Sequence, residues 1–167
     1  VCMDRHPWFA NPQVAQAVAT LRGSSELFVD AELHAWVLMP DHWHGVLQLG
    51  DHESLSGLMN RFKTRTAMAA NGVCGRKGGI WFSGFHDRAL RDDREVQAAT
   101  QYIRDNPVKA GLVKSAKDYY WSGFRSFHSQ GDEPLAVDHD WWWPEDSEKL
   151  SKAMKEMGWY CFEKRRG

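Results

Sequence analysis

Residues 33–49 read LHAWVLMPDHWHGVLQL, and this stretch decides the fold class. Leu33 to Met39 is apolar and rich in side chains that favour strands, and Pro40-Asp41 interrupts it. An apolar stretch then resumes from His44 to Leu49 and ends at Gly50. The pattern predicts two consecutive strands that pair as antiparallel neighbours.

The segments on either side of this pair carry the signals of helix ends and of further strands. Capping residues followed by apolar side chains at helical spacing predict helices, and short β-favouring runs predict strands. The predicted elements are a strand near Val1 to Met3, a helix from Asn11 to Gly23, a helix after Ser54 with Leu55, Leu58, Met59, Phe62 and Met68 on its apolar face, a strand from His86 to Leu90, and a helix from Asp92 or Asp93 to Asn106, stopped by Pro107. This order predicts an α+β sandwich in which helices pack on one face of an antiparallel sheet.

The packed domain is expected to span residues 1–127, with residues 128–167 as a C-terminal extension that is first acidic and then basic. Residues 119–124 have a turn-like composition, and residues 149–157 are expected to form a last amphipathic helix. The first residue is Val1 rather than Met, so we expect native residues, and part of the opening strand, to precede this numbering.

The composition excludes several classes of protein. The 167 residues are 43% hydrophobic and 26% charged, which is typical of one globular domain. The central apolar run from Ala35 to Met39 is far shorter than the roughly 20 residues that a membrane helix needs. Cys2, Cys74 and Cys161 are scattered, so they predict neither a disulfide framework nor a zinc knuckle and favour the reducing cytoplasm.

The charge is unevenly distributed along the chain. The formal net charge is −1, but residues 61–77 contain five basic residues and no acidic one. Residues 132–148 contain seven acidic residues and no Lys or Arg, and without them the rest of the chain would carry +6. A basic body with an acidic appendage is compatible with a nucleic-acid partner, although solvated charged faces without a partner explain the pattern about as well.

His42 and His44 are the first candidate site. Side chains at i and i+2 of a strand point to the same face, so two imidazoles there can hold one divalent ion. An arbitrary H-x-H pair more often lies in a turn or on the surface of a sheet.

Tyr102 and Asn106 are the second candidate, because the i, i+4 spacing places a phenol and an amide on one face of a helix. The amide oxygen could complete a metal site while the phenol reaches a substrate. Asn106 is explained as well by capping a new turn that starts at Pro107, and Tyr102 by a place at the edge of the core.

The nine tryptophans are assigned mostly to the core. Trp81, Trp121 and Trp141 to Trp143 fall in turn-like segments, where stacking on bases or contact with a partner is an alternative.

Three separated motifs together resemble the single-tyrosine HUH transposases, and within them the REP-associated tyrosine transposases. The first motif is Met39-Pro40-Asp41-His42-Trp43-His44 followed by an apolar strand, the second runs from Gly79 to Asp92, and the third runs from Tyr102 to Val113. The resemblance extends from Val1 to Phe127.

The resemblance implies a ferredoxin-like sheet with the histidines on a central strand and the tyrosine on a helix across from them. It implies that the hydroxyl of Tyr102 attacks a phosphodiester of single-stranded DNA, which gives a covalent 5′-phosphotyrosine and a free 3′-hydroxyl. His42, His44 and Asn106 would be the ligands of Mg²⁺ or Mn²⁺.

The resemblance also implies DNA that folds into hairpins at short palindromes. It favours a monomer, with a dimer as the alternative. Basic residues are the candidates for contacts with DNA phosphates. They are Arg61, Lys63, Arg65, Arg76, Lys77, Arg88, Arg91, Arg104 and Lys109.

The leading hypothesis is therefore a metal-dependent endonuclease and strand transferase that acts near hairpins through Tyr102. Two alternatives stand beside it. One is a domesticated hairpin-binding protein without catalysis, and the other is a metal hydrolase of small phosphoesters that uses His42 and His44 alone.

Overall fold

A three-stranded antiparallel sheet forms the centre of the computed structural model, which describes residues 1–21, 24 and 26–124. Its strands are β1 (Ala31–Met39), β2 (His42–Leu49) and β3 (Ser122–Phe124), in the order β2-β1-β3. β1 is the middle strand, and Ala35, Val37 and Leu38 on it are at most 1% exposed. The predicted antiparallel pair of strands is confirmed, with Met39 opposite His42 and a two-residue turn between them.

Three α-helices of the described residues surround the sheet, and each begins at a side-chain cap that the sequence predicts. α1 (Pro12–Thr20) is capped by Asn11, α2 (Leu55–Cys74) by Ser54 and α3 (Asp93–Lys109) by Asp92. Each cap accepts a hydrogen bond from a backbone N–H of the first turn, at 2.9 to 3.1 Å. α2 ends at Gly75, whose φ of 60° is the left-handed conformation that glycine adopts without strain.

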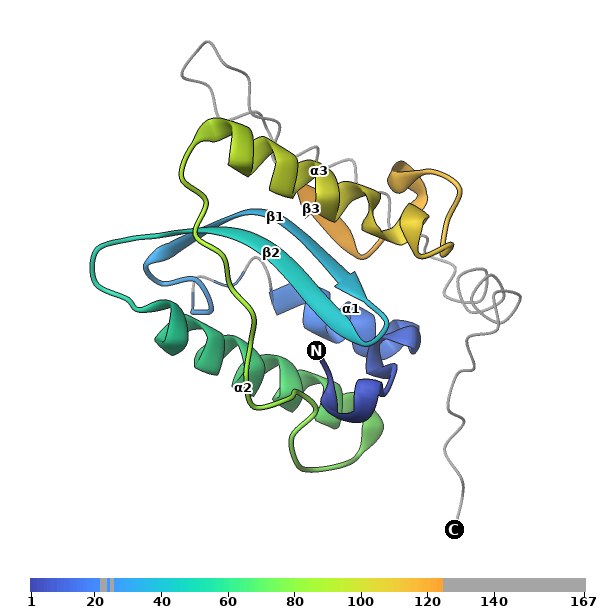
Figure 1. Ribbon diagram of the computed structural model, residues 1–167. Coiled ribbons are helices and arrows are strands. Elements are labelled where there is room, and N and C mark those ends of the chain that lie inside the picture. Colours follow the sequence, from blue (N-terminus) through green and yellow to red (C-terminus); the bar gives the residue numbers. More distant parts are fainter. Residues whose placement is uncertain (22–23, 25, 125–167) are drawn as a thin grey trace.

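The two faces of the sheet carry different helices. Successive residues of a strand point to opposite faces, and Trp43 packs against Phe62 of α2 with 4.6 Å between ring centroids, whereas His44 contacts Tyr102 of α3. Figure 1 shows α1 and α2 below the sheet and α3 above it. The α+β class with an antiparallel sheet is confirmed, but the expectation that all helices pack on one face holds only for α1 and α2.

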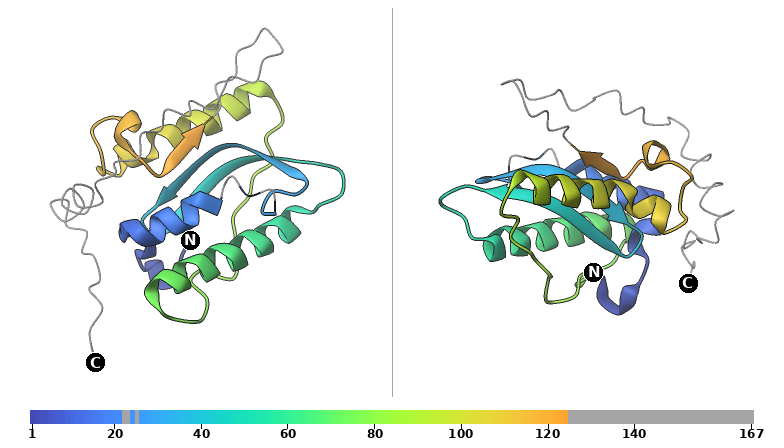
Figure 2. Two further views of the ribbon diagram at one scale, coloured as in Figure 1. Left: turned by 180° about the vertical axis from the view of Figure 1, so that it is seen from behind. Right: turned by 45° about the horizontal axis from the view of Figure 1, so that its top comes forward.

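The core lies mainly between the sheet and the α1–α2 layer. Trp36, Leu38 and Trp43 of the sheet meet Val18 of α1 and Phe62 of α2 around one small cavity. α3 closes the opposite face with fewer buried residues, of which Ile103 and Pro107 belong to the helix. Figure 2 shows α3 beside β3 in both of its views.

Several predicted elements differ from the structure. The opening strand is reduced to one bridge between Cys2 and Trp81, followed by the short 3-10 helices η1 (Met3–Arg5) and η2 (Trp8–Ala10). Residues 86–90 form no strand, because they lie in the connection from α2 to α3, where most of them are exposed and pair with no neighbouring strand. α1 ends at Thr20, before the predicted stop.

The end of the described region also differs. β3 lies where the sequence predicts a turn-like segment. The N–H of Leu38 donates to the carbonyl of Trp121 at 2.7 Å and extends the pairing of β3 with β1. β3 follows the short 3-10 helix η4 (Ala116–Asp118). The predicted domain end at 127, the extension over 128–167 and its last helix lie outside the described residues.

Three tryptophans of the described region are buried in the core, and Trp8 and Trp43 are half-buried against it. Trp36, Trp81 and Trp121 are 7%, 8% and 3% exposed, so the alternative that Trp81 and Trp121 offer free faces for base stacking is wrong. The indole N–H of Trp81 donates to the hydroxyl of Thr66 at 2.8 Å. Trp141 to Trp143 lie outside the described residues.

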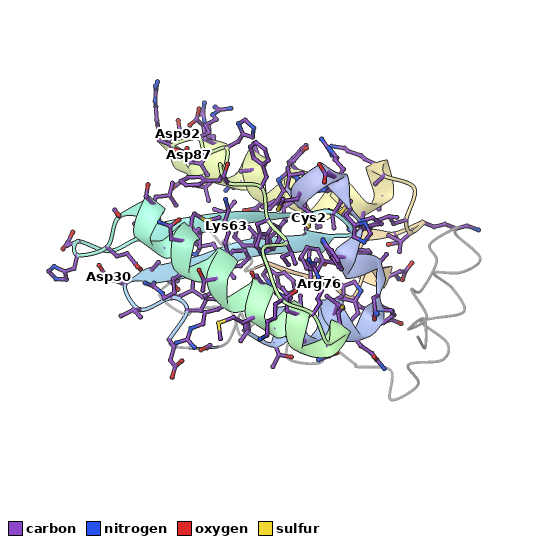
Figure 3. The ribbon with its side chains drawn as sticks, turned by 90° about the horizontal axis from the view of Figure 1, so that it is seen from below. Cys2, Asp30, Lys63, Arg76, Asp87 and Asp92 are labelled. Atoms are coloured by element: carbon purple, nitrogen blue, oxygen red, sulfur yellow. The ribbon has the colours of Figure 1, made fainter. Side chains whose placement is uncertain are left out.

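Lys63 on α2 holds the connection that carries the chain from α2 to α3. Its ammonium donates to the carbonyls of Phe82, Ser83 and Gly84 at 2.9, 3.2 and 2.7 Å. Figure 3, which views the molecule from the α2 side, shows Lys63 beside this connection. Three acceptors around one ammonium fix the path of the segment that leads to α3.

Two strand glycines make room for indole rings on the α1–α2 face. A Cβ at Gly45 would fall on the ring of Trp43, and one at Gly123 would fall on the ring of Trp36. Both glycines lie opposite Trp36 in the sheet, one on β2 and one on β3. The rings therefore cover bare backbone, and a methyl group at either position would displace them.

We predict that Gly45→Ala lowers the free energy of unfolding by about 1–3 kcal/mol, because Trp43 would have to leave its place against Phe62. Chemical denaturation monitored by circular dichroism measures the loss. Gly72→Ala is the matched control, since a Cβ there meets nothing within 4 Å and alanine favours the interior of α2 by about 1 kcal/mol. Equal stability of the two variants would contradict the packing described for Gly45.

Candidate active site

His42 and His44 lie together on the face of β2 that looks toward α3. Their ring centroids are 4.8 Å apart and the rings are nearly perpendicular. Both side chains are half-buried. The strand alternation that sends Trp43 into the core thus leaves two imidazoles side by side on the opposite face.

Tyr102 on α3 meets this pair. Its ring centroid is 5.7 Å from that of His44, with the rings edge to face at 85°. Ile103, the next residue, is 4% exposed and anchors α3, whereas Tyr102 is 51% exposed at the rim of the helix. The ammonium of Lys109 lies 5.3 Å from the centroid of the Tyr102 ring, within reach of a cation–π contact. The structure therefore brings the predicted tyrosine to the predicted histidines.

Asn106 lies one turn after Tyr102 and is half-buried. The i, i+4 spacing places both side chains on the same face of α3. The helix continues through Pro107 to Lys109, and the carbonyl of Asn106 accepts a hydrogen bond from Ala110 N–H at 2.9 Å. The expectation that α3 stops at Pro107 is wrong, and so is the alternative that Asn106 caps a new turn there.

Asp41, immediately before the first histidine, takes part in the site. Its carboxylate accepts a hydrogen bond from Nδ1 of His42 at 2.5 Å, and Arg5 lies 3.3 Å from its other oxygen. Burial acts to raise the pKa of Asp41, but the bonds from His42 and Arg5 outweigh it and hold this pKa below its ordinary value. Neither Asp41 nor Arg5 is among the residues predicted from the sequence. The available signal for Asp41 is its place next to a predicted ligand histidine.

His44 has the most strongly shifted titration in the site. Burial of its ring, assisted by the nearby His42 and by the N-terminal ammonium, lowers its pKa to about 4. At neutral pH the ring is uncharged, and an uncharged imidazole has a lone pair available for a metal ion or a proton.

We predict that His44 in the metal-free chain remains neutral down to about pH 4. An unfolded chain protonates this side chain near its ordinary pKa of 6.5, so it binds a proton that the folded chain does not bind. The free energy of unfolding therefore falls as the pH drops from about 6.5 to about 4, and this loss is smaller in His44→Asn. Thermal unfolding of both proteins over this pH range, together with NMR titration of the ring protons, measures the effect, and a titration midpoint near 6.5 would contradict it.

The donor set fits a divalent cation that binds nitrogen and oxygen. His44 is neutral, and a neutral His42 ring that donates from Nδ1 to a carboxylate has its lone pair on Nε2, as in carboxylate–histidine–metal sites. Within residues 1–21, 24 and 26–124, no group of three or more His, Cys, Asp or Glu is arranged to hold a metal ion. The third ligand that the resemblance implies, the amide oxygen of Asn106, is of another kind.

The predicted DNA-contacting residues are divided between the two sides of the sheet. Those on or just after α2 lie on the side away from the histidines, and several already have partners in the chain. Arg61 donates to the carbonyl of Leu27 at 2.9 and 3.0 Å and to both carboxylate oxygens of Glu53. The guanidinium of Arg76 lies 4.3 Å from the centroid of the Trp8 ring. The ammonium of Lys63 donates to carbonyls of the connection between α2 and α3. Arg65 pairs with Glu26 at 3.3 Å, and Lys77 is exposed just after α2.

The remaining four lie on α3 or just before it. Arg88 pairs with Glu95 of the first turn of α3 at 2.6 Å, and Arg91 is exposed two residues before that helix begins. Arg104 and Lys109 are exposed on α3 itself, the helix that carries Tyr102. The structure therefore brings Arg88, Arg91, Arg104 and Lys109 to the Tyr102 side of the molecule.

A family model described as IS200-like transposase matches residues 1–106, which include the histidine pair, Tyr102 and Asn106. The chain belongs to this transposase family. The described part of this family member contains no helix with the length and apolar composition that crossing a bilayer requires.

Known relatives of this transposase-family chain agree with the resemblance noted from its motifs. A REP-associated tyrosine transposase of Escherichia coli K12 is 33% identical over 112 residues, which are 66% of this chain and 62% of that protein. A putative REP-associated tyrosine transposase of Haemophilus influenzae is 30% identical over 103 residues, 56% of this chain and 58% of that protein. The chain thus spans less than two thirds of the length of either relative.

A solved structure shows the same fold. It is a REP-associated tyrosine transposase bound to a REP hairpin, with a TM-score of 0.53 and 26% sequence identity, and the match covers 66% of this chain and 63% of that one. The resemblance to the REP-associated branch of the transposases, made from the sequence motifs, is confirmed.

Proposed function

We propose that this chain is a metal-dependent endonuclease and strand transferase of single-stranded DNA that acts near hairpin-forming palindromes. The observation that carries the proposal is the contact between Tyr102 and His44, with His42 beside it, at the surface of α3. The family of the chain and the hairpin bound by its structural relative support the same function.

Tyr102 is proposed as the nucleophile. Its phenolic oxygen forms a bond to the phosphorus of a phosphodiester, and the bond from phosphorus to the 3′ oxygen breaks. The phenol loses one proton and the leaving 3′ oxygen gains one, so the step balances. The product is a 5′-phosphotyrosine, which conserves the energy of the phosphodiester for rejoining to another 3′ end. Tyr102 is 51% exposed, so a DNA strand can reach it without any opening of the fold.

His42, His44 and Asn106 are proposed to hold Mg²⁺ or Mn²⁺. When bound there, such an ion polarises and orients the scissile phosphate. The two rings contribute neutral nitrogen ligands, which favour Mn²⁺ over Mg²⁺. Because His44 is neutral at pH 7, its ring does not have to lose a proton before the ion binds.

Phosphates of the bound DNA are proposed to contact the basic residues on the Tyr102 side. Lys109 is the nearest of them to the nucleophile, and its ammonium can reach a phosphate held beside the Tyr102 ring. The cations on the α2 side are weaker candidates, because Arg61 and Lys63 are bonded within the chain. We propose a monomer, since Tyr102 and the histidines of one chain already meet.

We predict that Tyr102→Phe abolishes the covalent protein–DNA adduct while hairpin binding weakens by less than about tenfold, the most that one lost hydrogen bond is expected to cost. The protein is incubated with labelled single-stranded hairpins and Mg²⁺ or Mn²⁺, then resolved on denaturing and native gels. Tyr120→Phe is the matched control, since Tyr120 is another exposed tyrosine, at 37%, and should keep the adduct.

Two results would replace the proposal. Retarded hairpin without adduct in either metal would identify a hairpin-binding protein without catalysis. Turnover of small phosphoesters that survives Tyr102→Phe would identify a metal hydrolase.

We predict that Asn106→Ala raises the Mn²⁺ concentration for half-maximal adduct formation by at least about tenfold, because one of the proposed ligands is lost. Asn106→Asp should retain a ligand oxygen and stay closer to the wild type. Gln101→Ala is the control, as Gln101 is an exposed amide on the same helix whose side chain bonds to Asp105. An unchanged Mn²⁺ requirement in Asn106→Ala would exclude Asn106 as a ligand.

A further inference from the structure

The turn that joins β1 to β2 is unusual for so short a hairpin. Met39 pairs with His42, so Pro40 and Asp41 alone form the loop. Two-residue hairpin loops favour turns with positive φ at one or both residues, because that geometry matches the twist of the strands. Neither Pro40 nor Asp41 has positive φ, so contacts from outside the hairpin must help to fix this turn.

The N-terminal segment supplies those contacts. The N–H of Cys2 donates to the carbonyl of Asp41 at 2.7 Å, and the N–H of Phe9 donates to the carbonyl of Pro40 at 2.9 Å. Cys2 and Phe9 are 2% and 1% exposed, so the segment is anchored in the core at both points. The turn is therefore held from outside on both of its residues.

Between these two anchors the segment adopts a strained conformation. Asp4 and Arg5 have φ values of 53° and 52°, in the left-handed region that residues other than glycine rarely occupy. Strain of this kind persists only where surrounding contacts impose it, and it is common at functional sites. Its effect here is to bring Arg5 to the side of Asp41, 3.3 Å from one carboxylate oxygen.

The other carboxylate oxygen of Asp41 receives the hydrogen bond from Nδ1 of His42. An ionised carboxylate only accepts hydrogen bonds, so the proton of a neutral His42 ring resides on Nδ1. Free imidazole side chains prefer the proton on the other nitrogen. Asp41 thereby imposes the less common tautomer, in which Nε2 has a lone pair.

We propose that Asp41 is a positioning residue for His42, held in place by the N-terminal segment, and that it presents Nε2 of His42 as a metal ligand. This inference rests on the proposed function and deepens it. Arg5 plays a smaller part, because its side chain is 72% exposed and exposed ion pairs contribute little. The contribution of Asp41 is larger, since its side chain is 19% exposed and its bond to the ring is short.

The first test reads the tautomer directly. Long-range ¹H–¹⁵N NMR spectra of the metal-free, full-length protein at neutral pH should show the ring proton of His42 on Nδ1. In Asp41→Ala the proton should move to Nε2, whereas in Asp41→Asn the amide oxygen can still accept and the Nδ1 proton should remain. A wild-type His42 protonated on Nε2 would overturn the proposal without any variant.

The second test measures Mn²⁺ binding in the absence of DNA, from the loss of the free-ion EPR signal. Asp41→Ala should weaken binding by about 10- to 100-fold, the usual effect of removing a partner of a ligand histidine. Arg5→Gln should weaken it by less than Asp41→Ala does. Asp51→Ala is the control, because Asp51 is an exposed carboxylate just beyond the opposite end of β2. Unchanged Mn²⁺ affinity in folded Asp41→Ala would overturn the proposal.

Neither measurement uses DNA, so the two proposals can fail separately. A tautomer and a Mn²⁺ affinity that depend on Asp41, in a protein that forms no adduct, would leave the positioning role intact and refute the nuclease. If the protein forms the adduct but its His42 tautomer and its Mn²⁺ affinity do not depend on Asp41, the nuclease is supported and the positioning role is refuted.

Discussion

The alternation of side chains along β2 is the constraint on which the rest of the structure depends. Trp43 points into the layer formed with α1 and α2, and its neighbours His42 and His44 point toward α3. A shift of one residue in the pairing with β1 would exchange these faces, placing two imidazoles in the core and an indole at the site. Packing of Trp43 against Phe62 therefore secures the positions of both histidines, although it touches neither.

The site combines groups from segments with different degrees of anchoring. The histidines belong to a strand paired along its length with the buried middle strand, whereas Tyr102 lies on a helix that is held chiefly by Ile103 and Pro107. The connection before that helix depends on Lys63, which donates to the carbonyls of three consecutive residues. Lys63 therefore helps to position α3, although Lys63 itself lies on the opposite side of the sheet. It does so by bonding to the backbone of the connection and not by contacting the site.

Much of this architecture follows from local sequence signals, and the exceptions have physical reasons. The hairpin, the three helix caps and the shared face of His42 and His44 depend on neighbouring residues, so the sequence predicts them. β3 depends on pairing with β1 and on Gly123 beneath an indole, which no local pattern shows. The path of α3 through Pro107 and the clamping of Asp41 by the N-terminal segment are likewise set by tertiary contacts.

The position of β3 has a consequence for the order in which the molecule is assembled. Residue 35 of β1 pairs with residue 124, whereas its pairing with β2 is complete by residue 49. During synthesis the hairpin and α2 can form early, but one edge of the middle strand keeps unpaired backbone groups until almost the whole described chain has left the ribosome. A nascent chain therefore has an open edge on β1 until residues 122–124 pair with it. Association with other chains through this edge is most favoured during the time before that pairing forms.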